Sequence, residues 1–147
     1  MTMDLPLALT IAGALVVVAV IAGVALGRVQ RRTRHHDGAQ IVRAAEVGVD
    51  RFGERATLLQ FSTEYCSRCP GVHRLLSDIS DDRVGVAHRE VDLTHRPDLA
   101  ARFHVLQTPT ILILDGHGAV RARMGGAPAR EAVDRELDLV TKESSYA

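Results

Sequence analysis

The two cysteines of the chain, Cys66 and Cys69, are separated by two residues and lie between two apolar segments. Thr57 to Phe61, before them, is a short apolar run typical of a buried strand. After them, Val72, Leu75, Leu76 and Ile79 recur with the spacing of one helix face. Two thiols at this spacing can close a small disulfide ring, and a thiolate beside a second thiol can perform thiol–disulfide exchange. This order of strand, cysteine pair and helix constrains both the fold and the chemistry.

The rest of the sequence continues the alternation of strands and helices. Residues 39–52 have a mixed pattern that predicts a short strand or irregular piece followed by a short helix. Further along we expect a strand at 84–91, a helix opened by Pro97, a strand at 110–114, a turn at 115–118, a strand at 119–124 and a last helix opened by Pro128. This order combines a β-α-β unit, whose crossover should be right-handed, with a β-β-α unit. The predicted fold class is therefore α/β, with a mixed central sheet flanked by helices.

The N-terminal segment from Leu5 to Gly27 contains no charged residue and is long enough to cross a bilayer as a helix. Arg28, Arg31, Arg32 and Arg34 follow it, and the positive-inside rule places that side in the cytoplasm. We therefore expect a single-pass membrane protein with a cytoplasmic domain. The expected organisation is a transmembrane helix at 5–27, a basic polar linker at 28–38, a folded domain at 39–141 and a tail at 142–147.

At this point the sequence resembles the thioredoxin family over roughly residues 56–140. The resemblance rests on Cys66-Ser67-Arg68-Cys69 between strand and helix, Thr108-Pro109 before the next strand, and Gly125-Gly126 before the last helix. It implies a thioredoxin-like fold, a cis peptide bond before Pro109 packed near the disulfide, and a backbone at Thr108 that pairs with an extended substrate, with Tyr65 in the same binding region.

The resemblance also assigns roles to the site residues. Cys66, which we expect at a helix start and next to the cation of Arg68, would be the nucleophile, and the more buried Cys69 the resolving thiol. Ser67 and Arg68 lie inside the ring, where residues tune the redox potential. A buried acid commonly precedes the first cysteine by six residues, but here Gln60 stands there, and its usual lysine neighbour is matched with His88. We therefore expect Cys69 to lose its proton through solvent or through His88.

Several alternatives compete with these interpretations. Cys66, Cys69 and His73 could contribute to a zinc site, but a fourth ligand is not evident. His35 and His36 are adjacent but more typical of a solvated linker, and Glu64 and Asp92 have ordinary surface explanations. The zero net charge and the scarcity of aromatic residues, with no tryptophan, argue against nucleic-acid binding.

The sequence therefore predicts a membrane-anchored thiol–disulfide oxidoreductase that needs no bound cofactor or metal. It would act on disulfide-bearing proteins or low-molecular-weight thiols, and a reductase or thiol pool would supply its electrons. Two alternatives stay open: the same chemistry on the outer face of the membrane, acting on exported proteins, and a redox-sensing membrane adaptor that does not turn over.

Overall fold

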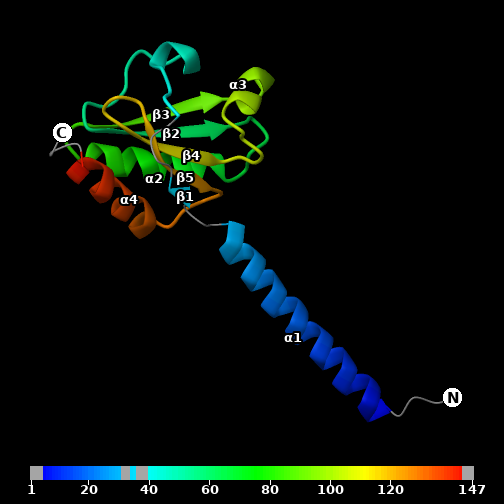
Figure 1. Ribbon diagram of the computed structural model, residues 1–147. Helices are drawn as coiled ribbons and strands as arrows, with labels where there is room; N and C mark the ends of the chain where they lie inside the picture. The colour runs from blue at the N-terminus through cyan, green and yellow to red at the C-terminus, as the bar shows by residue number, and fades with distance from the viewer. Residues whose placement is uncertain (1–4, 31–33, 36–39, 144–147) are drawn as a thin grey trace. The chain divides into compact units, whose positions relative to one another are not determined.

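The computed structural model describes residues 5–30, 34–35 and 40–143, and the chain divides into two compact units, Met1–Arg32 and Thr33–Ala147 (Figure 1). Each unit is described separately below. The boundary between the units lies inside the predicted linker at 28–38.

The first unit consists of α1 (Leu5–Gln30), a single helix of 26 residues. Its described side chains, at residues 9–24, are all exposed, including Leu15 at 65% and Val18 and Ile21 at 62%. Within the described residues, no helix combines the length and the apolar composition needed to cross a membrane. The helix expected here is thus present, whereas its role as a membrane span is not confirmed.

The second unit is built on a five-stranded mixed sheet with the order β1-β5-β4-β2-β3. The central strand β2 (Ala56–Ser62) pairs parallel with β3 (Val86–Asp92) and antiparallel with β4 (Thr110–Asp115). β5 (Val120–Gly125) continues the sheet as the hairpin partner of β4. All seven residues of β2 are buried, as expected for a strand covered on both faces.

Helices α2 (Cys69–Asp81) and α4 (Arg130–Glu143) cover one face of this sheet, as Figure 1 shows. Alternate strand residues such as Leu58 and Ile111 point toward them, because successive side chains of a strand point to opposite faces. They meet the apolar stripe of α2, including Leu76, and that of α4, including Leu137. This packing holds α2, and with it Cys69, firmly against the centre of the sheet.

The opposite face is covered by α3 (Pro97–Arg102) and by the short 3-10 helix η1 (Ala44–Val47). Its core includes Phe61 from β2, whose ring stacks on Phe103 with centroids 5.4 Å apart. The order of strands and helices predicted from residue 57 onward is confirmed, with ends that differ by at most a few residues.

Two segments differ from expectation. Instead of a strand and an α-helix, residues 40–52 contain an isolated bridge between Ile41 and Ala119 and then η1. Within the predicted linker, α1 continues to Gln30 and β1 (Arg34–His35) pairs with β5. Both β1 and Ile41 pair with residues far along the chain, so the local sequence pattern carried no sign of these pairings.

Candidate active site

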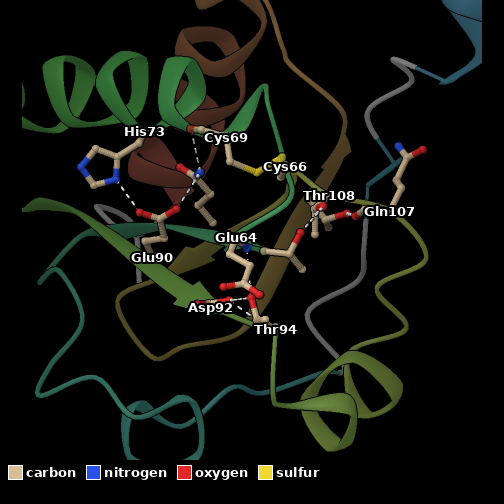
Figure 2. Close-up of a disulfide and its surroundings, with 12 residues drawn as sticks. Glu64, Cys66, Cys69, His73, Glu90, Asp92, Thr94, Gln107 and Thr108 are labelled. Atoms are coloured by element: carbon tan, nitrogen blue, oxygen red, sulfur yellow. Dashed lines mark hydrogen bonds and ion pairs between the residues drawn. A yellow bond between two sulfur atoms is a disulfide. The ribbon is translucent and has the colours of Figure 1, made fainter.

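A disulfide joins Cys66 and Cys69 where β2 ends, with an S–S distance of 2.13 Å and Cα atoms 5.4 Å apart (Figure 2). It occupies the connection between the central strand, which ends at Ser62, and α2. Two backbone hydrogen bonds shape this connection: the Cys66 N–H donates to Thr63 O at 3.0 Å, and the Cys69 N–H donates to Cys66 O at 3.2 Å. The ring is thus held on a turn anchored to the core of the sheet.

The two cysteines differ in exposure. Cys69 is 3% exposed, whereas Cys66 is half-buried, and Ser67 and Arg68 between them are exposed. An attacking thiolate must reach a substrate, so this difference agrees with Cys66 as nucleophile and Cys69 as resolving thiol. These roles stay predictions, as does the tuning role of Ser67 and Arg68.

Cys66 does not itself begin the helix, which corrects one expectation. α2 begins at Cys69, with Arg68 at its N-cap and Pro70 in its first turn. The residues between the cysteines form a separate turn, because Cys66 O accepts the N–H of Cys69. The electrostatic effect of the helix N-terminus therefore reaches Cys66 across this turn and weakens with distance.

A second loop meets the disulfide loop at this end of the sheet. The peptide bond between Thr108 and Pro109 is cis, as the resemblance implies, and Pro109 is buried. The hydroxyls of Thr63 and Thr108 lie 3.2 Å apart and join the two loops. Pro109 O accepts the N–H of Gly126 at 2.8 Å, which ties the loop to the glycine pair after β5. The three sequence features behind the resemblance therefore converge on one site.

A groove beside the disulfide is lined by residues from β2, the disulfide loop, α2 and β3, among them Cys66, Cys69, His73, Arg74, Glu90 and Asp92. Tyr65, on the disulfide loop, is 86% exposed, and a hydrogen bond with Glu64 raises the pKa of its hydroxyl. Its predicted contact with substrate is untested. The groove leaves room for a chain segment to approach the more accessible sulfur.

Asp92 has a structural explanation. Its carboxylate accepts hydrogen bonds from the side-chain hydroxyl and the backbone N–H of Thr94, and these bonds lower the pKa of Asp92. Thr94 Oγ1 in turn accepts the backbone N–H of Glu64 at 3.0 Å. Asp92 thus helps to hold the disulfide loop, a structural role that goes beyond the solvated surface charge expected for it.

Gln60 is fully buried and bonds to three partners, Cys69, Glu90 and His88. Its Nε2 donates to Cys69 O and to Glu90 Oε1, both at 3.2 Å. Its Oε1 lies 3.2 Å from Nε2 of His88, which must carry a hydrogen because an amide oxygen only accepts. Gln60 is therefore fixed in orientation and contributes no titratable group under the disulfide.

His88 is held neutral by its surroundings. Burial is the main cause that lowers its pKa to about 4, followed by the proximity of His73, whose ring meets its own edge-on at 4.8 Å. With Nε2–H bonded to Gln60, the other ring nitrogen accepts from the hydroxyl of Ser77 at 3.0 Å. Both nitrogens are occupied, which argues against His88 as the acceptor of the Cys69 proton.

Sequence reasoning missed Glu90, which lies directly beside Gln60 in the parallel register of β2 and β3. His88, expected as the strand neighbour of Gln60, lies two residues earlier, and both side chains reach the Gln60 amide. The remaining oxygen of Glu90 lies 2.7 Å from Nδ1 of His73. The sequence does not reveal the register between β2 and β3. This register places Glu90, and not His88, level with Gln60.

The alternative of a zinc site finds no geometric support in the part of the chain that the structure describes. There, no group of three or more His, Cys, Asp or Glu side chains is arranged to hold a metal ion. The two cysteines are joined to each other and His73 is bonded to Glu90. His36 and the side chain of His35 fall outside the described part.

Comparison with known proteins agrees with this geometry. The family model named thioredoxin matches residues 46–138. A curated thioredoxin from Chlorobaculum thiosulfatiphilum is 26% identical over 86 residues, which cover 58% of this chain and 79% of the relative.

Solved structures show a similar fold. A mutant thioredoxin from Halobacterium salinarum NRC-1 has a TM-score of 0.55 at 17% identity, covering 69% of this chain and 88% of its own. The thioredoxin NaTrxh from Nicotiana alata has a TM-score of 0.50 at 21% identity, covering 57% and 71%. At such identities the structures support the fold alone, so the chemistry depends on the family match and on the site.

Proposed function

The chain belongs to the thioredoxin family and carries the cysteine pair of a thiol–disulfide oxidoreductase, and we propose that it works as a membrane-anchored member that reduces or oxidises disulfides on the cytoplasmic side. Its substrates would be disulfide-bearing proteins or low-molecular-weight thiols. A reductase or a thiol pool would exchange electrons with the Cys66–Cys69 pair.

One observation carries the redox part of this proposal: an accessible and a buried cysteine share a disulfide beside a cis-proline loop and an open groove. In the reducing direction, the Cys66 thiolate attacks a substrate disulfide, forms a mixed disulfide and releases one substrate thiolate. The Cys69 thiolate then attacks Cys66 Sγ, which forms the Cys66–Cys69 bond and releases the second substrate thiolate. The two electrons come from the dithiol, and the leaving thiolates take up protons from solvent.

Trapping of the mixed disulfide tests this assignment of roles. Cys69→Ser should leave a lasting adduct with a disulfide substrate, because the attacking thiolate remains and the resolving thiol is gone. Cys66→Ser should form no such adduct and should lose turnover. Mass spectrometry of the intact adduct measures both outcomes. An adduct formed by Cys66→Ser and not by Cys69→Ser would reverse the roles, and adducts without turnover in the unaltered protein would favour the redox-sensing adaptor.

The membrane part of the proposal rests on the sequence of the first unit. Leu5 to Gly27 has no charged residue, and the apolar side chains described in α1 are exposed, an arrangement costly in water and favourable in lipid. The arginines that begin at Arg28 favour a cytoplasmic position for the second unit.

Extraction of membranes tests the anchor. The full-length protein should sediment with membranes and stay there in alkaline carbonate and in high salt, but should dissolve in detergent. A variant with Val17→Arg and Val18→Arg should move to the soluble fraction, because charged side chains at the centre of a span oppose insertion. A full-length protein that is released by carbonate would disprove the membrane anchor and leave the redox chemistry untouched.

A further inference from the structure

Glu90 is the acidic side chain linked to the resolving cysteine, although the mechanism above assigns it no role. It is on β3, level with Gln60 on β2, and it lines the same groove as Cys66 and Cys69. A single amide nitrogen, Gln60 Nε2, donates both to Glu90 Oε1 and to Cys69 O. Figure 2 shows the Glu90 carboxylate turned toward the His73 ring, to which it is bonded.

The titratable and charged groups that contact this carboxylate or line the same groove come from three elements. From α2, His73 holds Glu90 Oε2 through Nδ1 at 2.7 Å, and Arg74 lines the groove. From β3 itself come His88, whose ring meets that of His73, and Asp92, which is bonded to Thr94. From the disulfide loop comes Glu64, in the same groove. Glu90 alone among these acidic groups is bonded to the amide that holds Cys69.

We propose that Glu90 is a positioning residue that sets the acidity of Cys69, acting across the Gln60 amide. A negative charge disfavours the thiolate of a nearby thiol. Because Gln60 Nε2 connects Glu90 to the backbone of Cys69, Glu90 restrains Cys69 from ionising. It therefore slows premature attack by the resolving thiol and stabilises the disulfide relative to the dithiolate. His73 weakens the effect of Glu90 on Cys69, because its Nδ1–H donates a hydrogen bond to the carboxylate and partly offsets the negative charge. The inference rests on the thiol–disulfide exchange proposed above.

The test measures the thiol pKa of Cys69 alone, in full-length Cys66→Ser protein, from the pH dependence of its alkylation rate. Glu90→Gln keeps an oxygen that can accept from Gln60 Nε2 and removes the charge. It should lower the Cys69 pKa by about half a unit to one unit, a roughly threefold to tenfold increase in thiolate at a given pH. The same substitution in Cys69→Ser protein should shift the Cys66 pKa by less.

Two further variants distinguish a specific effect from a general one. Asp92→Asn removes one negative charge from the same groove but not from the Gln60 network, and it should shift the Cys69 pKa by less than half as much. Glu90→Asp keeps the charge and should leave the pKa close to its original value. Equal shifts in Glu90→Gln and Asp92→Asn, or no shift in Glu90→Gln, would overturn the proposal.

Redox activity separates this proposal from the function on which it rests. Glu90→Gln with both cysteines present should resolve the mixed disulfide faster near neutral pH and should have a less negative reduction potential, because its thiolates are better stabilised. If the unaltered protein exchanges disulfides and Glu90→Gln changes neither the pKa nor the resolution rate, the role of Glu90 alone is disproved. If the unaltered protein forms no mixed disulfide at all, the proposed function itself fails.

Discussion

Gln60 shows how one side chain decides which proton paths exist at the disulfide. Its amide satisfies Cys69 O, Glu90 and His88 at once, and it can neither release nor accept a proton at neutral pH. Since His88 is neutral and bonded at both nitrogens, the Cys69 proton is expected to leave through the groove solvent. The network therefore orders the site without taking part in proton transfer.

Gln60→Asp tests this view of the proton path. The new carboxyl group would be buried and close to Glu90, two conditions that raise its pKa and make it a better proton acceptor. The mixed disulfide should therefore resolve faster across about pH 6 to 9, while the first attack by Cys66 changes little. Gln60→Asn is the matched control, because it introduces a side chain of the same length as Gln60→Asp but without the charge. Stopped-flow measurement of both steps decides, and equal resolution rates in the two variants would mean that an acid at this position does not help.

Gln60→Asp should also cost stability. The substitution removes two hydrogen bonds donated by Nε2 and leaves their acceptors, Cys69 O and Glu90, without that donor. We expect a loss of roughly 2–4 kcal/mol in the free energy of unfolding, measured by urea denaturation of the oxidised protein. A variant as stable as the original protein would show that the buried amide contributes little.

His88 makes stability depend on pH. Its pKa is lowered from 6.5 to about 4 in the folded chain, so the unfolded chain binds the proton more readily. The contribution of neutral His88 to the free energy of unfolding is fully present above about pH 6.5 and is lost as the pH falls toward 4. Because the ring is partly exposed, we expect a loss of about 1–2 kcal/mol between about pH 7.5 and pH 5. The side chain introduced by His88→Gln cannot titrate, so this variant should lose less stability between the two pH values in urea unfolding. An unchanged pH dependence would contradict the role of His88.

At the level of elements, α2 links the disulfide to the core of the sheet. Cys69 opens the helix, and the apolar side chains beyond it pack against β2 and α4. The connection from β2 to α2 is short and its backbone is bonded within the turn. The position of the ring therefore depends on how well the helix packs.

Leu76→Ala tests this dependence. Leu76 is fully buried in α2, and its truncation should lower the free energy of unfolding by about 2–5 kcal/mol because it leaves a cavity. Leu139→Ala, on α4 at a position that is 48% exposed, is the matched control and should cost less than about 1 kcal/mol. Urea unfolding measures the stability of both variants. Similar losses of stability in the two variants would mean that the packing of Leu76 is not what holds the helix in place.

For the whole molecule, if α1 spans a membrane as proposed, the side on which the second unit lies decides its redox environment. A cytoplasmic position exposes the disulfide to a reducing thiol pool, whereas the outer face would favour oxidation. The same pair of cysteines could then work in opposite directions. The sidedness of the chain therefore selects among the functions that its fold permits.

Labelling of a single cysteine tests the sidedness. In a Cys66→Ser, Cys69→Ser background, Lys142→Cys places a thiol on the exposed end of α4. A membrane-impermeant maleimide should leave it unlabelled in intact cells and label it after lysis. Thr2→Cys in the same background is the control, because the opposite end of the predicted span should be labelled in intact cells. Labelling of Lys142→Cys before lysis would support the outer-face alternative.

The sequence alone determined the order of the elements and the chemistry of the cysteine pair. These features are local patterns, in which residues close together along the chain form one element or one loop. They are the apolar spacing in β2 and α2, the Cys66–Cys69 pair and the Thr108–Pro109 loop. Such patterns predict strands, helices and turns because local geometry sets the periodicity of buried side chains. The family and the location of its site followed from these features.

Only the tertiary structure decided which side chains meet. The place of Glu90 beside Gln60 depends on the register between β2 and β3, strands joined by the whole of α2, and the pairing of β1 with β5 spans an even longer stretch of chain. The neutral state of His88 likewise arises from burial and from a contact with His73 on another element. These relations depend on distances through space, which residue spacing along the chain does not encode, because a shift of register by one residue turns every side chain of a strand to the opposite face.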